Sequence, residues 1–192
     1  MTFSSDKNPE GAKICLVLSP PAKIKENNIE LIKEITEDHS DVIIITINQP
    51  AQYLTELYTL KGIDLEKVTF IDTITKYAMG KADESLPRCR FLNNPSDLTS
   101  LSIAVSETLK EIKGDKPYIL IDSINAMLIY LPSVNITKFI HFVTNKLRIL
   151  DLSGIYLAAE SGLDPIIMSQ LMTFTDKVIE MNDDENPETK KS

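Results

Sequence analysis

The sequence predicts an α/β domain in which helices cover both faces of a mostly parallel sheet. Short runs rich in Val, Ile and Leu recur along the chain at intervals too long for hairpins. Between these runs lie longer segments whose apolar residues repeat every three to four positions, which is typical of amphipathic helices. Strands that alternate with helices in this way indicate three layers, with the sheet in the middle.

The composition is consistent with a single globular domain. The chain has 192 residues, of which 43% are hydrophobic and 25% are charged. A chain of this size buries roughly 70% of its unfolded surface, so we expect a full apolar core that needs no metal or disulfide. We expect the domain to span residues 13–181 and the polar segments 1–12 and 182–192 to be disordered.

Six segments have the composition of buried strands. Asp41–Asn48 (DVIIITIN) is the most strand-like, because five of its residues are Val or Ile, and it suits a central strand. The six predicted strands, numbered one to six in chain order, are Lys13–Ser19, Asp41–Asn48, Val68–Asp72, Tyr118–Asp122, Gly154–Ala159 and Lys177–Met181.

Five segments have helical periodicity. Asp164 and Pro165 form a cap and first-turn pair that begins the last of them. Residues 73–94 are predicted to form a long loop, and residues 123–132 are apolar without a clear period. The predicted helices are Lys25–His39, Pro50–Leu60, Pro95–Lys113, Ser133–Leu150 and Pro165–Phe174.

Charge and metal-ligating residues argue against several classes of partner. The net charge of −8 and a pI near 4.8 disfavour nucleic acid, because a polyanion needs basic patches. His39 and His141 lack neighbours at ligand spacing, so we expect no metal site. Cys15 and Cys89 lack CxxC spacing, which predicts reduced thiols and a cytoplasmic location. No signal peptide or long apolar stretch is found, so no membrane association is expected.

Polar residues follow the predicted strands at the edge where parallel sheets bind ligands. Any one of them can instead be a turn former or a helix cap. Asp122 and Ser123 stand out, because four apolar residues running into Asp-Ser match the Walker B pattern that holds the magnesium of a nucleotide. The candidate positions are Ser19, Pro20, Asn48, Gln49, Asp72, Asp122, Ser123 and Glu160.

Several segments in this order resemble the KaiC and RecA superfamily of ATPases. They are YILIDSINAML, DVIIITINQPAQYL followed by GID and VTFID, and TDKVIEM, and the resemblance spans about Lys13 to Met181. It implies a three-layer α/β/α fold with the six strands in the order 3-2-4-5-1-6. In that order, the ends of the second and fourth strands lie side by side.

Hydrolysis in this superfamily needs a glycine-rich loop after the first strand, because backbone N–H groups wrap the phosphates. This chain has SPPAKIKENNIEL there, with no glycine between Gly11 and Gly62, and Pro20 and Pro21 have no N–H to donate. Lys23 and Lys25 are the basic residues that could still meet a phosphate, although exposed lysines at the start of a helix are ordinarily solvated.

Two further requirements are also unmet. Asn48 and Gln49 stand where the resemblance places an acidic general base, and amides take up no proton at neutral pH. The resemblance also implies a cation beyond the fifth strand that acts across a subunit boundary, yet residues 149–176 contain no Lys or Arg. We therefore expect no catalytic residues and no resident cofactor.

The resulting expectation is a catalytically inactive RecA/KaiC-like domain that acts in regulation or as a scaffold through protein contacts. Its partner would be another protein, a second copy or an active paralogue. Candidate contact segments are Ala126–Leu131, which can equally be core, and the 73–94 loop with Tyr77, Met79, Arg88, Arg90 and Phe91. The degenerate nucleotide-site positions would be Asp122, Ser123, Asn48, Gln49, Lys23 and Lys25.

Two alternatives remain open. One is a noncatalytic sensor that still binds ATP and magnesium. The other is a small α/β enzyme that uses the strand-end carboxylates Asp72, Asp122 and Glu160, which would converge only if the strand order differed from the one implied by the resemblance.

Overall fold

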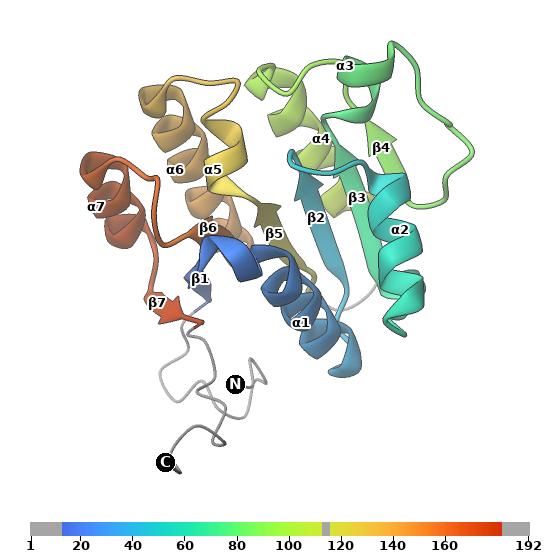
Figure 1. The fold of residues 1–192 in the computed structure, drawn as a ribbon, viewed down its shortest axis with the longest axis horizontal. Coiled ribbons are helices and arrows are strands. Elements are labelled where there is room, and N and C mark those ends of the chain that lie inside the picture. The colour runs from blue at the N-terminus through green and yellow to red at the C-terminus, as the bar shows by residue number, and fades with distance from the viewer. Residues whose placement is uncertain (1–12, 113–115, 182–192) are drawn as a thin grey trace, which may run out of the picture.

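A computed structural model describes residues 13–112 and 116–181 of the chain. A parallel sheet lies between two layers of helices (Figure 1), and its strands are ordered β4-β3-β2-β5-β6-β1-β7. The strands are β1 (Ile14–Ser19), β2 (Val42–Thr46), β3 (Val68–Asp72), β4 (Cys89–Phe91), β5 (Tyr118–Asp122), β6 (Ser153–Ala159) and β7 (Lys177–Glu180).

The strand order confirms the implied arrangement. The six predicted strands are β1, β2, β3, β5, β6 and β7, and their relative order across the sheet is 3-2-4-5-1-6 in the numbering of the prediction. The additional strand, β4, lies inside the segment predicted as a loop and pairs with β3 at the edge of the sheet. Three half-buried residues at an edge leave no apolar run in the sequence, so the pattern did not indicate this strand.

The five long helices occur where the periodicity predicts them. Two short helices, α3 and α5, lie in the segments predicted to be irregular, because one turn of helix is too short to show a period. The helices are α1 (Ile24–Glu37), α2 (Ala51–Leu60), α3 (Thr75–Met79), α4 (Leu98–Glu111), α5 (Ile124–Met127), α6 (Ser133–Leu150) and α7 (Pro165–Phe174), with 3-10 turns η2 (Pro21–Lys23) and η3 (Leu65–Lys67).

The core consists of one apolar layer on each face of the sheet. Helices α1 and α2 cover one face, and α4, α5, α6 and α7 cover the other (Figure 1). Alternate residues of β2 contribute to the two layers, with Ile43 and Ile45 on the α4 to α7 side and Ile44 on the α1 and α2 side. The central strands are therefore buried on both faces, as their composition predicted.

No helix within residues 13–112 and 116–181 has both the length and the hydrophobicity that a membrane crossing requires. The predicted disorder of segments 1–12 and 182–192 concerns residues outside those described.

Truncating a central core residue tests this packing. Ile45 lies in register with Ile71 and Ile121 on the neighbouring strands, and all three side chains are buried. We expect Ile45→Ala to lower the free energy of unfolding by about 2–5 kcal/mol and Ile45→Val by about 0.5–1.5 kcal/mol, because each leaves a cavity of different size. Urea denaturation measures both. The exposed control Leu60→Ala should change the value by less than about 0.5 kcal/mol.

Candidate functional site

A small cavity lies at the carboxyl edge of the sheet, on the face that α1 and α2 cover. Its volume of about 10 Å³ gives it room for about one water molecule. Side chains from the first turns of α1, from the turn after β2, from α2 and from the end of β5 line it: Ile24, Lys25, Asn28, Asn48, Gln49, Leu54, Leu57 and Asp122.

Asp122 is the acidic residue of this cavity. It ends β5 between two buried strands, and only 5% of it is exposed. Its carboxylate accepts no hydrogen bond from the described residues. Burial favours the neutral form of the acid and raises the pKa of Asp122 to about 7. The carboxyl group therefore changes its charge near neutral pH.

Asn28 lines the cavity together with Asp122, and its side chain is hydrogen-bonded to the buried Tyr58 behind it. The Tyr58 hydroxyl donates a 2.6 Å hydrogen bond to Asn28 Oδ1, while Asn28 Nδ2 is buried without a partner among the described residues. Burial raises the pKa of Tyr58, and the negative charge of Asp122 raises it further. Tyr58 therefore stays a neutral donor that holds the Asn28 amide in place.

The sequence interpretation missed Asn28, although a signal was present. Asn28 lies four residues before Ile32 and seven before Ile35, which places it on the apolar stripe of α1. An amide on a buried stripe needs hydrogen-bonding partners inside the protein. The spacing identified the stripe, but the partner of Asn28 is Tyr58 on the neighbouring helix α2, which is 30 residues away in sequence.

The connection from β1 to α1 turns tightly through Pro20 and η2. The Ser19 hydroxyl accepts a 2.8 Å hydrogen bond from Asn27 Nδ2 and donates a 3.0 Å hydrogen bond to the carbonyl of Pro20. Lys23 ends the turn and is exposed. Lys25 donates to the Tyr53 hydroxyl, and its Nζ lies 4.9 Å from the centre of that ring. The amine of Lys25 is thus held against α2.

The structure brings four of the six degenerate nucleotide-site positions together. The turn after β2 rests against β5, because the backbone N–H of Ile47 donates a 3.2 Å hydrogen bond to the carbonyl of Asp122. This contact places Asn48 and Gln49 at the cavity beside Asp122, and Lys25 is the fourth member. Lys23 and Ser123 do not line it.

Ser123 has a different role from Asp122. Its side chain caps α5 by accepting a 3.4 Å hydrogen bond from the backbone N–H of Ala126. The turn-and-cap interpretation of strand-end residues therefore describes Ser123.

The carboxylates of Asp72 and Glu160 do not line the cavity with Asp122. Asp72 accepts four hydrogen bonds, from the backbone N–H groups of Ala51, Ile74 and Thr75 and from the Thr75 hydroxyl, at 2.6–2.8 Å. It therefore anchors the starts of α2 and α3 to the sheet. Glu160 follows β6 and is exposed. Among the described residues, no three His, Cys, Asp or Glu side chains are grouped as a metal site requires.

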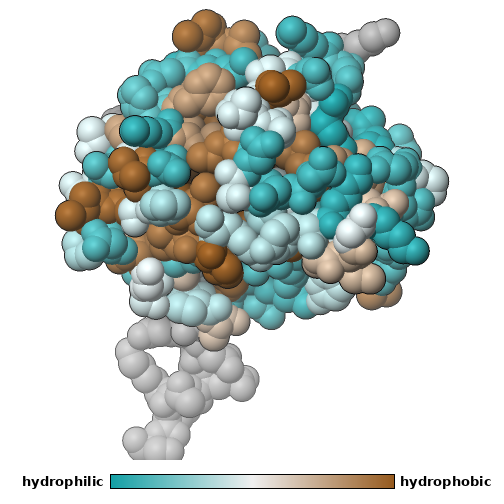
Figure 2. Space-filling model, turned by 90° about the horizontal axis from the view of Figure 1, so that it is seen from above, coloured by the Kyte–Doolittle hydropathy of each residue, from teal (hydrophilic) through white to brown (hydrophobic). Residues whose placement is uncertain are grey.

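The two predicted contact segments are only partly at the surface. Within Ala126–Leu131, Ala126, Met127 and Leu131 are buried, whereas Ile129 is 72% exposed. In the 73–94 loop, the Tyr77 ring packs edge-on against Tyr130, with centroids 5.6 Å apart. Figure 2 looks down on the carboxyl edge of the sheet. It shows that apolar surface gathers over the half of the molecule that contains α5, α6 and α7. The exposed apolar side chains of those helices and their linkers include Ile129, Val134, Ile166 and Met172.

The environment of Asp122 predicts a pH-dependent stability. Its folded-state pKa of about 7 lies above the value of about 3.9 in an unfolded chain, so between these values only the folded state holds the proton. Stability is therefore lost as the pH rises from about 4 to 7, by up to about 1.4 kcal/mol per pH unit. Asp122→Asn mimics the protonated form and avoids this loss.

Urea denaturation of both proteins at several pH values measures the effect. The free energy of unfolding of Asp122→Asn minus that of the wild type should grow with pH up to about 7 and then level off. All other titrating groups cancel in this difference. A difference that does not change with pH would contradict the assigned environment.

Comparison with known proteins identifies solved structures that have a similar fold. No curated protein matches the chain. The uncharacterized protein PH0321 from Pyrococcus horikoshii, solved in complex with an unknown peptide, is similar at a TM-score of 0.69 and 13% identity, covering 88% of this chain and 77% of that one. The KaiC-like protein PH0186 from Pyrococcus horikoshii OT3 is similar at a TM-score of 0.60 and 16% identity, covering 93% and 75%.

These likenesses show a KaiC/RecA-like fold, as the sequence segments implied. The family model of DUF7504, a family of unknown function, matches residues 15–181, which is nearly all of the described chain. The chain therefore belongs to the DUF7504 family.

Proposed function

We propose that this chain is a RecA/KaiC-like domain that does not hydrolyse ATP and that acts in regulation or as a scaffold through protein contacts. The observation that carries the proposal is the cavity at Asp122, which has room for about one water molecule at the edge where the fold would hold a triphosphate. The cavity beside Asp122 is therefore too small to enclose a triphosphate.

The backbone before α1 supports this proposal. A phosphate cradle uses several N–H donors, and Pro20 and Pro21 have none. The lysine that lines the cavity, Lys25, donates one hydrogen bond to the Tyr53 hydroxyl, which directs its amine toward α2. Asp122, the residue that would hold magnesium, lies in surroundings that favour its neutral form at pH below about 7, which weakens its attraction for a cation.

The proposed loss of hydrolysis also rests on the missing proton acceptor. Asn48 and Gln49 lie beside Asp122, at the place where a general base would orient the attacking water. Their amides take up no proton near neutral pH. Asp72, which ends the next strand, is saturated by four donors.

Exposed apolar surface supports the proposed protein contacts. Ile129, Val134 and Ile166 are more than half exposed. Figure 2 shows apolar surface gathered over the α5 to α7 half of the molecule, and large exposed apolar surface is typical of interaction sites. PH0321, whose fold is similar, was solved in complex with a peptide. Cys15 and Cys89 are free thiols, and we extend the proposal to a cytoplasmic location, where thiols remain reduced.

Nucleotide assays of the purified chain test the proposal. With millimolar ATP and magnesium, we expect no phosphate release above background and a change in melting temperature below about 1 °C, because a ligand that does not bind the folded state cannot stabilise it. Asp122→Asn, which alters the cavity, should behave like the wild type in both assays.

Other results would favour the alternatives. A shift of several degrees that Asp122→Asn abolishes would identify a nucleotide sensor, and phosphate release that the same change abolishes would identify an enzyme.

Cross-linking in the native extract followed by mass spectrometry tests whether the chain contacts other proteins. We expect a defined protein neighbour or a second copy of the chain, and a chain recovered only as a monomer would contradict it.

A further inference from the structure

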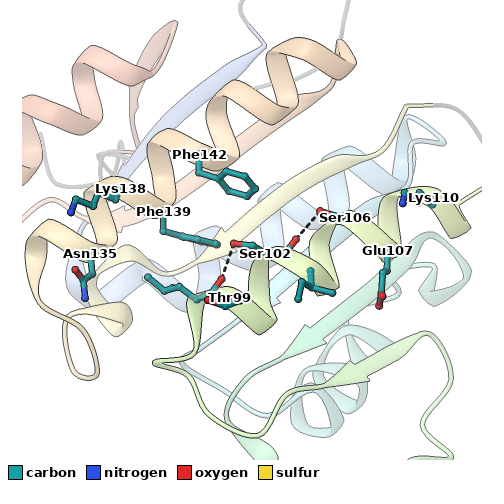
Figure 3. A pocket seen from close by; sticks show the side chains of 11 residues that line it. Thr99, Ser102, Ser106, Glu107, Lys110, Asn135, Lys138, Phe139 and Phe142 are labelled. Atoms are coloured by element: carbon teal, nitrogen blue, oxygen red, sulfur yellow. Dashed lines mark hydrogen bonds between the residues drawn. The ribbon is translucent and has the colours of Figure 1, made fainter.

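A groove runs between α4 and α6, on the face of the sheet opposite the Asp122 cavity (Figure 3). Its volume is about 630 Å³, which is within the usual range for a binding site in a protein. It is lined by Leu98, Thr99, Ser102, Ile103, Ser106, Glu107 and Lys110 of α4 and by Asn135, Lys138, Phe139 and Phe142 of α6.

The apolar lining of the groove includes two large side chains that the core does not bury. Phe139 is 4% exposed and forms part of the floor, whereas Phe142 is 43% and Ile103 is 53% exposed. Both lie off the apolar stripes that the sequence pattern assigns to the buried sides of these helices. Exposed aromatic and aliphatic side chains that line a common groove are typical of a docking surface.

The two serine hydroxyl groups of the groove are already satisfied. Ser102 donates a 2.7 Å hydrogen bond to the carbonyl of Leu98, and Ser106 donates a 2.8 Å hydrogen bond to the carbonyl of Ser102 (Figure 3). Each hydroxyl proton is used within α4, so these serines do not require polar partners from a ligand. The groove between the helices therefore suits apolar side chains.

The charges around the groove favour an acidic partner. Lys110 and Lys138 line it and have no ion-pair partner among the described residues, and Lys146 lies 5.8 Å from the centre of the Phe142 ring. Glu107, the acidic residue of the lining, is paired with Arg90 at 2.6 Å. In a chain of net charge −8, this groove is thus a locally basic surface.

We propose that the α4–α6 groove binds an amphipathic helix of another protein, whose aliphatic face is flanked by Asp or Glu residues. Leu or Ile side chains one turn apart would contact Ile103, Phe139 and Phe142, and the flanking carboxylates would meet Lys110 and Lys138. This inference deepens the proposed function by naming a surface and the chemistry of the partner.

The other occupants fit less well. A second copy that docked through the same face across a two-fold axis would bring two copies of this locally basic surface together, which is unfavourable. Segment 182–192 of this chain (NDDENPETKKS) is acidic at its start but contains no aliphatic or aromatic residue to fill the groove. A helix of another protein that carries both acidic and aliphatic side chains matches the surface.

Designed peptides test the proposal. The probe is a fluorescein-labelled, alanine-based helix of about 16 residues with Leu at the anchor positions i, i+4 and i+7 and Glu beside them. Matched peptides replace every Glu by Lys or every Leu by Ser. By fluorescence anisotropy, the Leu/Glu peptide should bind at least about 10-fold more tightly than either control.

Variants of the chain locate the binding site. Phe142→Ser and Ile103→Ser should each weaken binding of the Leu/Glu peptide at least about fivefold, because both remove exposed apolar contacts. The double variant Lys110→Glu/Lys138→Glu should reverse the preference toward the Leu/Lys peptide. Leu60→Ser/Lys61→Glu, at the end of α2 on the opposite face, is the matched control and should bind like the wild type. Circular dichroism verifies that each variant is folded.

Several outcomes would overturn the proposal: equal binding of the Glu and Lys peptides, binding unaffected by the groove variants, or no binding at all. A dimer that Phe142→Ser dissociates would identify a second copy as the occupant. Markedly tighter peptide binding after deletion of residues 1–12 would identify that segment instead. If the nucleotide assays show no activity and no peptide binds, the groove assignment fails while the proposed function stands.

Discussion

The burial of the central strands on both faces is the constraint on which this structure depends. Strands β2 and β5 have helices on either side, so polar side chains are confined to the positions where the strands end. Thr46, Asp72 and Asp122 occupy the same row at the ends of three adjacent strands, and all are buried.

The polar groups of these three buried residues differ in their hydrogen bonding. Thr46 donates its hydroxyl proton to the carbonyl of Gln49, which closes the turn after β2. Asp72 accepts four hydrogen bonds and anchors two helices. Asp122 accepts none from the described residues, and its raised pKa is the consequence. Asp122 differs from Thr46 and Asp72 because its buried carboxylate has no hydrogen-bond donor among the described residues.

The two faces of the sheet separate two kinds of surface. On one face, the tight β1 to α1 connection and the amides of Asn28, Asn48 and Gln49 surround a cavity with room for about one water molecule. On the other, α4 and α6 leave an open, partly basic groove. A change in the groove therefore need not disturb the cavity, because the buried sheet lies between them. Substitutions at Asp122 and substitutions in the groove therefore test nucleotide binding and protein binding separately.

Local sequence patterns determined the α/β class, the long helices and the buried strands, because hydrophobic periodicity is a property of neighbouring residues. They also determined that Asp122 ends a strand and that Pro20 and Pro21 precede a helix. The strand order came from the resemblance of several segments taken together. The short edge strand β4 was not predicted. It is defined by its pairing with β3, and its own composition does not indicate a strand.

Only the tertiary structure decided which strand-end residues meet. It brought Lys25, Asn48 and Gln49 to Asp122 and assigned Ser123 to a helix cap. It also paired Asn28 with Tyr58 and placed Ile103 and Phe142 in one groove. These contacts join residues far apart in the chain, and they follow from how helices pack on a twisted sheet, which no single segment encodes.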